Sequence, residues 1–504
     1  AVGPIRHMPV VPGKHSVGRG KSKHFVDVQN DVTVADIALA VREGYRSVEH
    51  AKRYTTLGMG PDQGKMGGMA GFAALADSLG KTMPEVGTTT FRPPYTPVPF
   101  GAVAGRDVGA LADPARTTPM QSWHVSAGAV FDSAGQWLLP DHYPKEGEDR
   151  AAAVRRECLA VRQGVGIRDG STLGKVDIRG PDSARMLDWI YTNAWGSLGV
   201  GRCRYGVMLG EDGMVMDDGV TARLGEDHYL MHTTTGNASG AFWWMEEWLQ
   251  NEWLDYKVWL TSVTEQWAVV NIAGPRARDL LAELCRDIDL SNDAFPHMSA
   301  RHGRVAEIPA RVFRVSFTGE MSYEINVAAG FGLALWNAVM LAGQRYGITP
   351  FGAEAVHVLR AEKGYLAAGQ EIDGTVTPQD LGLDWAVSKK KADFLGKRSL
   401  TRSAMVRDDR KQLVGLLTKD PAVVLPEGAQ IVGELRTAPP MPMIGHVTSS
   451  YHSPILGRSI ALALVKGGRA RIGETVSLPL RDRTVEAEVT KPIFYDPEGG
   501  RLHA

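Results

Sequence analysis

The sequence predicts an α+β protein with a small helical domain, a larger module of mixed strands and helices, and a strand-rich C-terminal tail. Apolar residues recur at helical spacing within residues 33–79, whereas short strands alternate with amphipathic helices beyond residue 146. After a break at 403–412, the segments LVGLLT, IGHVTSSY, SIALALV and ETVSLPL indicate a small β-barrel or sandwich. At 504 residues the chain exceeds one ordinary core, so we expect several domains.

The composition is that of a globular protein without a dominant charge. Hydrophobic residues make up 43% of the chain, and 56 Lys and Arg residues balance 57 Asp and Glu residues. This balance argues against nucleic acid or an anionic membrane as a partner and favours recognition through local sites. We expect a cytoplasmic protein, because neither a long apolar span nor a secretory signal is apparent. Three widely spaced cysteines predict buried thiols and no metal site: Cys158, Cys203 and Cys285.

Residues 1–83 are expected to form the helical domain. Thr33 and Asp36 have the spacing of a capping box, and apolar residues follow at helical intervals up to Gly44, which should end the first helix. We expect further helices at residues 49–53 and 72–79.

Residues 84–117 are expected to form a linker or arm. The segment FRPPYTPVPF at 91–100 is rich in proline, which removes backbone donors and disfavours helix. An exposed tether and an arm packed on another surface both fit this composition. The interleaved aromatic residues favour the packed arm: Phe91, Tyr95 and Phe100.

Two adjacent carboxylates, Asp217 and Asp218, follow a turn in YGVMLGEDGMVMDDGVTARL. Side chains alternate along a strand, so one carboxylate can point inward while the other is solvated. The alternative is that both residues are solvent-exposed side chains of a surface hairpin without a functional role.

A second candidate, Glu324, lies in FRVSFTGEMSYEINV at residues 313–327. Its carboxylate could accept hydrogen bonds from neighbouring N–H groups of an amino-heterocycle such as a pterin. The alternative is a glutamate of a surface hairpin. A third group of charged residues, in the helix within 357–385, is equally compatible with a solvated face held by ion pairs: Arg360, Glu362 and Lys363.

Taken in order, these segments resemble the glycine-cleavage T-protein (aminomethyltransferase) family from about residue 118 to the C-terminus. The resemblance implies a three-lobed cloverleaf that binds folate. Residues 118–402 would form the folate-binding module and residues 403–504 the C-terminal barrel.

The resemblance also implies roles for individual residues. Asp218 would be the catalytic carboxylate beside the folate, and Tyr205 and Glu324 would contact the folate. Arg360 would support Glu324, and Trp385 lies in a stretch similar to the family's late folate-lining segment.

Three further segments resemble the oxidase-linked branch of the family, the α subunits of heterotetrameric sarcosine oxidases: GVGIRDGSTLGKVDIRGPD, GAVFDSAGQWLLPDHY and TTTFRPPYTPVPFGAVAG. This branch implies a β subunit carrying FAD, smaller subunits, and FMN at a subunit interface, with FRPPYTPVPF as a candidate FMN contact. NAD is expected only if a further N-terminal domain exists, because these residues lack its Gly-rich strand–turn–helix. The sequence would then be the latter half of the subunit, or the subunit is divided.

The function that follows is conversion of an imine, made by the flavin subunit, and tetrahydrofolate into 5,10-methylenetetrahydrofolate. The alternatives are a stand-alone aminomethyltransferase, the α subunit of a dimethylglycine or N-methylglutamate dehydrogenase, and a folate-binding scaffold without catalysis.

Residues 25–67 resemble a small helical domain that binds a [2Fe-2S] cluster in related oxidoreductases. Such clusters need thiolate ligands, so the substitutions at the four ligand positions predict a helical scaffold without a cluster. Those positions are filled by Asp27, Gln29, Asp62 and Gly67.

Overall fold

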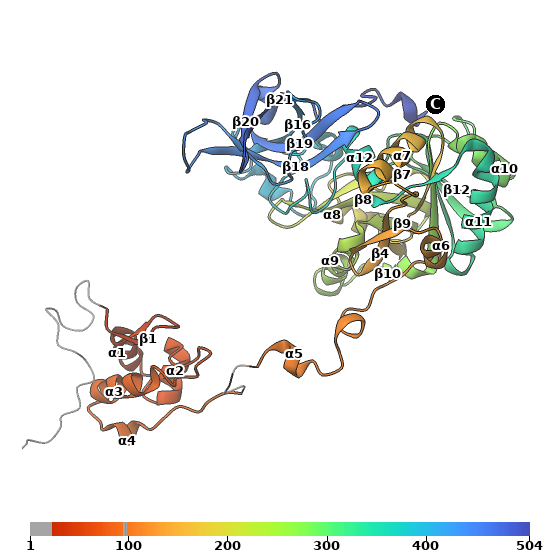
Figure 1. Ribbon diagram of the computed structural model, residues 1–504. Helices are drawn as coiled ribbons and strands as arrows, with labels where there is room; N and C mark the ends of the chain where they lie inside the picture. Colours follow the sequence, from red (N-terminus) through yellow and green to blue (C-terminus); the bar gives the residue numbers. More distant parts are fainter. Residues whose placement is uncertain (1–22, 94–95, 97, 504) are drawn as a thin grey trace, which may run out of the picture. The chain divides into compact units, whose positions relative to one another are not determined.

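The computed structural model describes residues 23–93, 96 and 98–503. The chain divides into two compact units, Ala1–Pro114 and Ala115–Ala504 (Figure 1). Among the described residues, no helix combines the length and the apolar character needed to cross a bilayer.

The first unit is a small helical domain, as expected. Its three main helices are α1 (Val34–Arg42), α2 (Val48–Thr55) and α3 (Gly68–Leu79), and they pack around a shared apolar core with the short strands β1 (Phe25–Asp27) and β2 (Val32–Thr33). The Thr33–Asp36 capping box is confirmed, because the Asp36 carboxylate accepts from Thr33 N at 2.8 Å and Thr33 Oγ1 accepts from Asp36 N. The short helices α4 (Met83–Val86) and α5 (Phe100–Val103) follow. Of the proline-rich segment 91–100, residues 94, 95 and 97 lie outside the described residues.

The four positions that replace cysteines hold loop backbone together. Asp27 accepts from Gln29 N at 2.9 Å and from Gly58 N at 2.8 Å, and Asp62 accepts from Met66 N at 2.9 Å. A Cβ atom at Gly67 would lie 2.2 Å from the Val26 carbonyl oxygen, so this position has no room for a side chain. Hydrogen bonds to carboxylates therefore stabilise these loops, and the absence of a cluster stays a prediction.

The second unit is built on two antiparallel-dominated sheets. The five-stranded sheet has the order β10-β6-β9-β8-β7, and the six-stranded sheet has the order β12-β13-β14-β11-β5-β15. The strands of the first sheet are β6 (Gly174–Arg179), β7 (Cys203–Leu209), β8 (Val215–Gly225), β9 (His228–Thr233) and β10 (Trp259–Ser262). Those of the second are β5 (Gly166–Asp169), β11 (Trp267–Ala273), β12 (Ser299–Val305), β13 (Ile308–Arg314), β14 (Ser322–Ala328) and β15 (Thr349–Pro350).

Helices cover one face of each sheet and leave the other faces opposed. Apolar residues of α8 (Ser183–Ile190) and α9 (Ala238–Asn251) pack on the five-stranded sheet. Those of α10 (Ala277–Leu284) and α11 (Gly332–Gly343) pack on the six-stranded sheet (Figure 1). A smaller apolar cluster joins the opposed faces and includes Cys203, Ala222, Leu230 and Phe313. The hairpin of β3 (Val130–Ala134) and β4 (Trp137–His142) and the helix α6 (Gln121–Ser126) complete this part.

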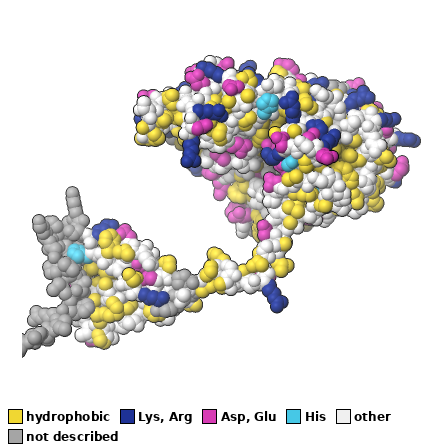
Figure 2. All heavy atoms as spheres, in the orientation of Figure 1, with side chains coloured by type: hydrophobic (Ala, Val, Ile, Leu, Met, Phe, Trp, Pro, Cys, Tyr) yellow, Lys and Arg dark blue, Asp and Glu magenta, His cyan; other side chains and the backbone are white. Residues whose placement is uncertain are grey.

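The C-terminal tail forms a closed six-stranded barrel of order β16-β19-β18-β17-β20-β21, which decides between the barrel and the sandwich expected from sequence. The two sheets and this barrel are the three lobes of the expected cloverleaf. Figure 2 shows acidic and basic side chains mixed over the visible face of this unit, in keeping with its balanced composition. The barrel strands are β16 (Lys411–Thr418), β17 (Gln430–Val432), β18 (Met443–Ser453), β19 (Arg458–Lys466), β20 (Thr475–Pro479) and β21 (Thr484–Thr490).

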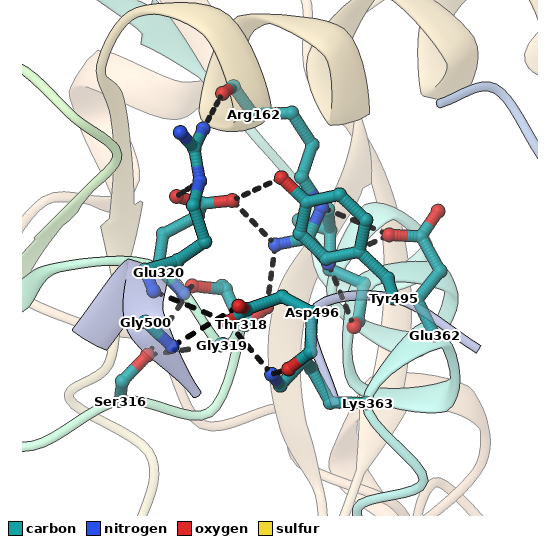
Figure 3. A network of polar contacts seen from close by, with 12 residues as sticks. Arg162, Ser316, Thr318, Gly319, Glu320, Glu362, Lys363, Tyr495, Asp496 and Gly500 are labelled. Carbon is teal, nitrogen blue, oxygen red and sulfur yellow. Dashed lines mark hydrogen bonds and ion pairs between the residues drawn. The ribbon is translucent and has the colours of Figure 1, made fainter. Parts of the chain in front are cut away.

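A buried ion network centred on Arg162 joins the lobes (Figure 3). Arg162 ends helix α7 (Arg150–Gln163) and pairs with Glu320 at 3.0 Å and with Glu362, in helix α12 (Ala353–Glu362), at 2.6 Å. The segment after the barrel closes the network, because Arg501 Nε donates to Glu320 at 3.0 Å and Tyr495 lies under the Arg162 guanidinium. Four separate parts of the chain therefore meet in one network: α7, the loop with Glu320, α12 and the segment after the barrel.

We expect Arg162→Met to destabilise the second unit strongly. The substitution leaves two buried carboxylates without their shared cation, and breaking such a pair typically costs about 3–5 kcal/mol. Urea unfolding followed by tryptophan fluorescence measures the loss as a lower midpoint. Arg407→Met is the control, because its pair with Asp409 is exposed and the midpoint should hardly move. Equal midpoints for the two variants would contradict the assignment.

Candidate functional site

Strand β8 separates the two adjacent carboxylates onto opposite faces of its sheet. Asp217 turns to the helix-covered face, where it is 1% exposed and accepts from Thr234 Oγ1 at 2.8 Å. Asp218 pairs with Val207 and lies on the face opposed to the second sheet, together with Val220. The two carboxylates point to opposite faces as alternation predicts, and Asp217 is buried while Asp218 is half-buried. The alternative that both lie on a surface hairpin is wrong.

Tyr205 on β7 donates a hydrogen bond from its hydroxyl to Asp218 Oδ2 at 2.7 Å. Burial raises the pKa of Asp218 to about 7, even though the hydrogen bond from Tyr205 favours the ionised form. The ring of Tyr205 stacks on Trp385, with 5.7 Å between ring centroids, and Trp385 is 69% exposed. The structure therefore brings three of the sequence-predicted residues together as an aromatic pair that leads from the surface to a carboxylate.

A polar row crosses the opposed face of the six-stranded sheet. Arg168, Asn271 and Glu324 are direct cross-strand partners on β5, β11 and β14. Asn271 Nδ2 donates to Glu324 Oε1 at 3.4 Å, and Ser322 Oγ donates to Asn271 Oδ1 at 3.1 Å. Burial raises the pKa of Glu324, and the nearby cations Arg168 and Lys175 partly offset this effect. Glu324 thus belongs to the opposed faces and is no surface hairpin residue.

Two basic residues that the sequence analysis did not single out lie on the same face as Asp218. Lys175 on β6 is the direct cross-strand partner of His232 on β9. Lys175 Nζ donates to the carbonyls of Ser171 and Leu173 at 2.8 and 2.9 Å, and burial lowers its pKa to about 8. Polar and apolar residues alternate in GKVDIR, and this alternation carried a signal for Lys175. In HYLMHT three consecutive apolar residues precede His232, so the local pattern carried no such signal for that position.

Arg360 does not support Glu324, which corrects the expected contact. Its side chain is buried and turns toward the barrel, where it pairs with Glu371 at 2.6 Å and donates to Ser449 Oγ at 2.6 Å. A carboxylate and a hydroxyl outside helix α12 accept hydrogen bonds from the two terminal nitrogens of the guanidinium, so it is committed to holding the barrel lobe. The alternative of a solvated helix face is wrong for the same reason, because Glu362 and Lys363 are also buried in ion pairs.

The opposed faces combine two half-buried carboxylates, Asp218 and Glu324, with the cations Arg168 and Lys175. A carboxylate with a pKa of about 7 can take up or release a proton at neutral pH. Glu324 and Asn271 offer oxygen acceptors to N–H groups of a ligand. The described residues contain no group of three or more His, Cys, Asp and Glu side chains placed to hold a metal ion, and the three cysteines are buried free thiols.

Comparison with known protein families gives three matches. Residues 120–391 match the GCVT N-terminal domain, residues 411–496 the glycine cleavage T-protein C-terminal barrel domain, and residues 21–106 the sarcosine oxidase A3 domain. The fold is similar to that of the glycine cleavage system aminomethyltransferase T from Bartonella henselae, with a TM-score of 0.65 and 25% sequence identity. That likeness covers 76% of this chain and 98% of the Bartonella chain.

Individual relatives match over different extents. The sarcosine oxidase α subunit of Corynebacterium sp. strain P-1 is 53% identical over 95% of this chain and 50% of its own length. The corresponding subunit of Rhizobium meliloti is 44% identical over 96% of this chain and 49% of its own length. The chain therefore spans about half the length of these relatives. An aminomethyltransferase of Thermotoga sp. strain RQ2 is 31% identical over 75% of this chain and 98% of its own length.

The raised pKa of Asp218 makes stability depend on pH. In the unfolded chain an aspartate titrates near pH 4, so protonation of Asp218 favours the folded state. This contribution is complete below pH 4 and is lost as pH rises to about 7. We expect wild type to lose stability relative to Asp218→Asn between pH 5 and pH 8, measured by urea unfolding. For Asp212→Asn, at the exposed turn of the same hairpin, the difference from wild type should stay constant. A constant difference for Asp218→Asn as well would show that its pKa is not raised.

Proposed function

The chain belongs to the GCVT aminomethyltransferase family, and from this premise we propose that it is the folate-binding part of a sarcosine oxidase-type complex. In this complex a flavin subunit oxidises an N-methyl amine to an imine, and the present chain transfers the one-carbon unit of the imine to tetrahydrofolate. The observation that carries the proposal is the half-buried Asp218, held by Tyr205 and facing the sheet that bears Glu324.

The described residues fit a reduced folate. A pterin ring presents neighbouring N–H donors, and the half-buried carboxylate of Glu324 offers a matching pair of acceptor oxygens. Tyr205 and the exposed Trp385 provide aromatic surface between the solvent and Asp218. Arg168 and Lys175 partly offset the negative charge of Glu324.

Tetrahydrofolate supplies the amine that takes up the one-carbon unit, which gives 5,10-methylenetetrahydrofolate and releases the demethylated amine. Asp218 is placed to accept the proton that the folate amine loses as that bond forms and to return it to the departing amine, because its pKa of about 7 allows both the ionised and the protonated form near neutral pH. Tyr205 orients the carboxylate through the 2.7 Å hydrogen bond. Glu324 holds the ring so that the two reactants meet at high effective concentration.

The partners proposed are a β subunit carrying FAD and the smaller subunits of a heterotetrameric oxidase, with FMN at a subunit interface. No step is assigned to FMN here, since part of its candidate contact FRPPYTPVPF lies outside the described residues. NAD is not assigned to these residues. A cytoplasmic location stays a prediction.

The match of residues 21–106 to the sarcosine oxidase A3 domain favours an oxidase subunit over a stand-alone aminomethyltransferase. The Thermotoga aminomethyltransferase matches only 75% of this chain, whereas the Corynebacterium α subunit matches 95%. The α subunit of a dimethylglycine or N-methylglutamate dehydrogenase would carry out the same folate chemistry. Assays of the co-purifying subunits with each amine distinguish these dehydrogenases from a sarcosine oxidase. The alternative of a folate-binding scaffold without catalysis is tested by the variant Asp218→Ala.

Asp218→Ala should abolish methylenetetrahydrofolate formation in the reconstituted complex, while the flavin subunit continues to oxidise the amine. The reason is that the proton acceptor is lost without any change to the oxidation site. Product folate and hydrogen peroxide or reduced flavin are measured in parallel, with Asp212→Ala as the hairpin control. A scaffold role predicts unchanged product folate in Asp218→Ala, and equal loss of both activities would place Asp218 outside the transfer step.

Glu324→Gln should weaken tetrahydrofolate binding by roughly 10- to 100-fold, because a hydrogen bond to a charged acceptor contributes about 1.5–3 kcal/mol. Calorimetric titration of the purified chain measures the change. The matched control is Glu307→Gln, at a turn where the side chain is 91% exposed. If both variants bind tetrahydrofolate like wild type, Glu324 is not a ligand contact.

A further inference from the structure

The side chain of His232 has one partnered and one unpartnered ring nitrogen. The residue is 7% exposed, and its Nδ1 lies 3.1 Å from the Val220 carbonyl oxygen. A carbonyl can only accept, so Nδ1 carries the hydrogen and donates it. Nε2 is left with its lone pair, and among the described residues it has no hydrogen-bond partner.

His232 projects from its sheet toward the sheet that carries Glu324. Its ring meets Phe313 edge-on, with 5.4 Å between centroids, and Phe313 is the direct cross-strand partner of Glu324. Val220, which accepts from His232, is the cross-strand partner of Tyr205 and lies two residues after Asp218. The unpartnered nitrogen is therefore on the opposed faces, between the groups proposed to handle folate.

Burial and the neighbouring Lys175 hold the pKa of His232 at about 4. The imidazole is consequently neutral at physiological pH and acts as an acceptor at Nε2, with too little basicity to serve as the proton acceptor. A buried acceptor without a donor costs free energy, so such a group in a ligand site points to a donor on the ligand. The neighbouring Lys175 does not supply the missing donor, because its Nζ donates to the carbonyls of Ser171 and Leu173.

We propose that His232 Nε2 accepts a hydrogen bond from a ring N–H that exists only in a reduced pterin, and so selects reduced over oxidised folate. This proposal rests on the proposed function and deepens it. Reduction places hydrogens on N5 and N8 of the pyrazine ring, whereas the oxidised ring has lone pairs there. In an oxidised ring the lone pair of the pyrazine nitrogen would face the lone pair of His232 Nε2. Two acceptors facing each other in a buried site disfavour binding of the oxidised ring. His232 is thus a specificity-determining residue beside the catalytic carboxylate.

His232→Asn is the decisive variant. The asparagine amide retains a donor for the Val220 carbonyl but is too short to place an acceptor where Nε2 lies. Anaerobic calorimetric titration of the 504-residue chain with tetrahydrofolate and with folic acid gives a ratio of dissociation constants. We expect wild type to prefer tetrahydrofolate and His232→Asn to reduce that preference by roughly tenfold. Titration with 7,8-dihydrofolate, which carries a hydrogen on N8 but not N5, identifies the nitrogen that donates.

Two controls separate this role from a structural one. His302→Asn, at an exposed position of the edge strand β12, should leave the ratio unchanged. His232→Gln restores an acceptor at longer reach and should regain part of the preference, with thermal unfolding confirming that each variant is folded. An unchanged ratio in a His232→Asn protein that still binds tetrahydrofolate overturns the role of His232 alone. Failure of wild type to bind either compound overturns the proposed function and this inference together.

Discussion

Loss of hydration between the two opposed sheets is the constraint on which the site depends. The same burial raises the pKa of Asp218 to about 7, lowers that of Lys175 to about 8 and lowers that of His232 to about 4. Burial disfavours every charged form, so acids and bases shift in opposite directions. The carboxylate of Asp218, the amine of Lys175 and the imidazole of His232 therefore have different pKa values although they lie on the same face. Strand alternation selects which side chains enter that space.

Buried ion pairs hold the lobes around this space. Arg162 links α7, α12 and the loop that carries Glu320, while Arg360 links α12 to the barrel through Glu371 and Ser449. Paired charges of this kind gain little net stability over apolar packing, but each partner becomes costly to remove. Their geometry fixes how the barrel and the sheets meet. The site itself holds both a short contact, the 2.7 Å hydrogen bond from Tyr205 to Asp218, and a longer one, the 3.4 Å contact of Asn271 with Glu324.

Local patterns in the sequence predict much of this arrangement. The Thr33–Asp36 cap, the helices of the first unit and the strands of the barrel follow from spacing alone. Contacts that depend on strand register cannot be predicted from spacing alone. Tyr205 reaches Asp218 diagonally across the β7–β8 pair, and its role came from family resemblance. The family resemblance implied Glu324 as the partner of Arg360, whereas the structure pairs Arg360 with Glu371, 11 residues later, and with Ser449, 89 residues later. His232 follows three consecutive apolar residues in HYLMHT, so no local pattern points to it, and its unpartnered nitrogen is visible only in three dimensions.

The segment that follows the barrel has a consequence for the newly made chain. Glu320 accepts from Arg501, 181 residues later, and from Tyr495, 175 residues later. During synthesis, both sheets can leave the ribosome before either partner exists. Until then, Arg162 is the one cation available to Glu320, and it also pairs with Glu362. Docking of the last segment onto Glu320 is therefore expected to be a late, post-translational step, and a prematurely terminated chain would lack both of these contacts.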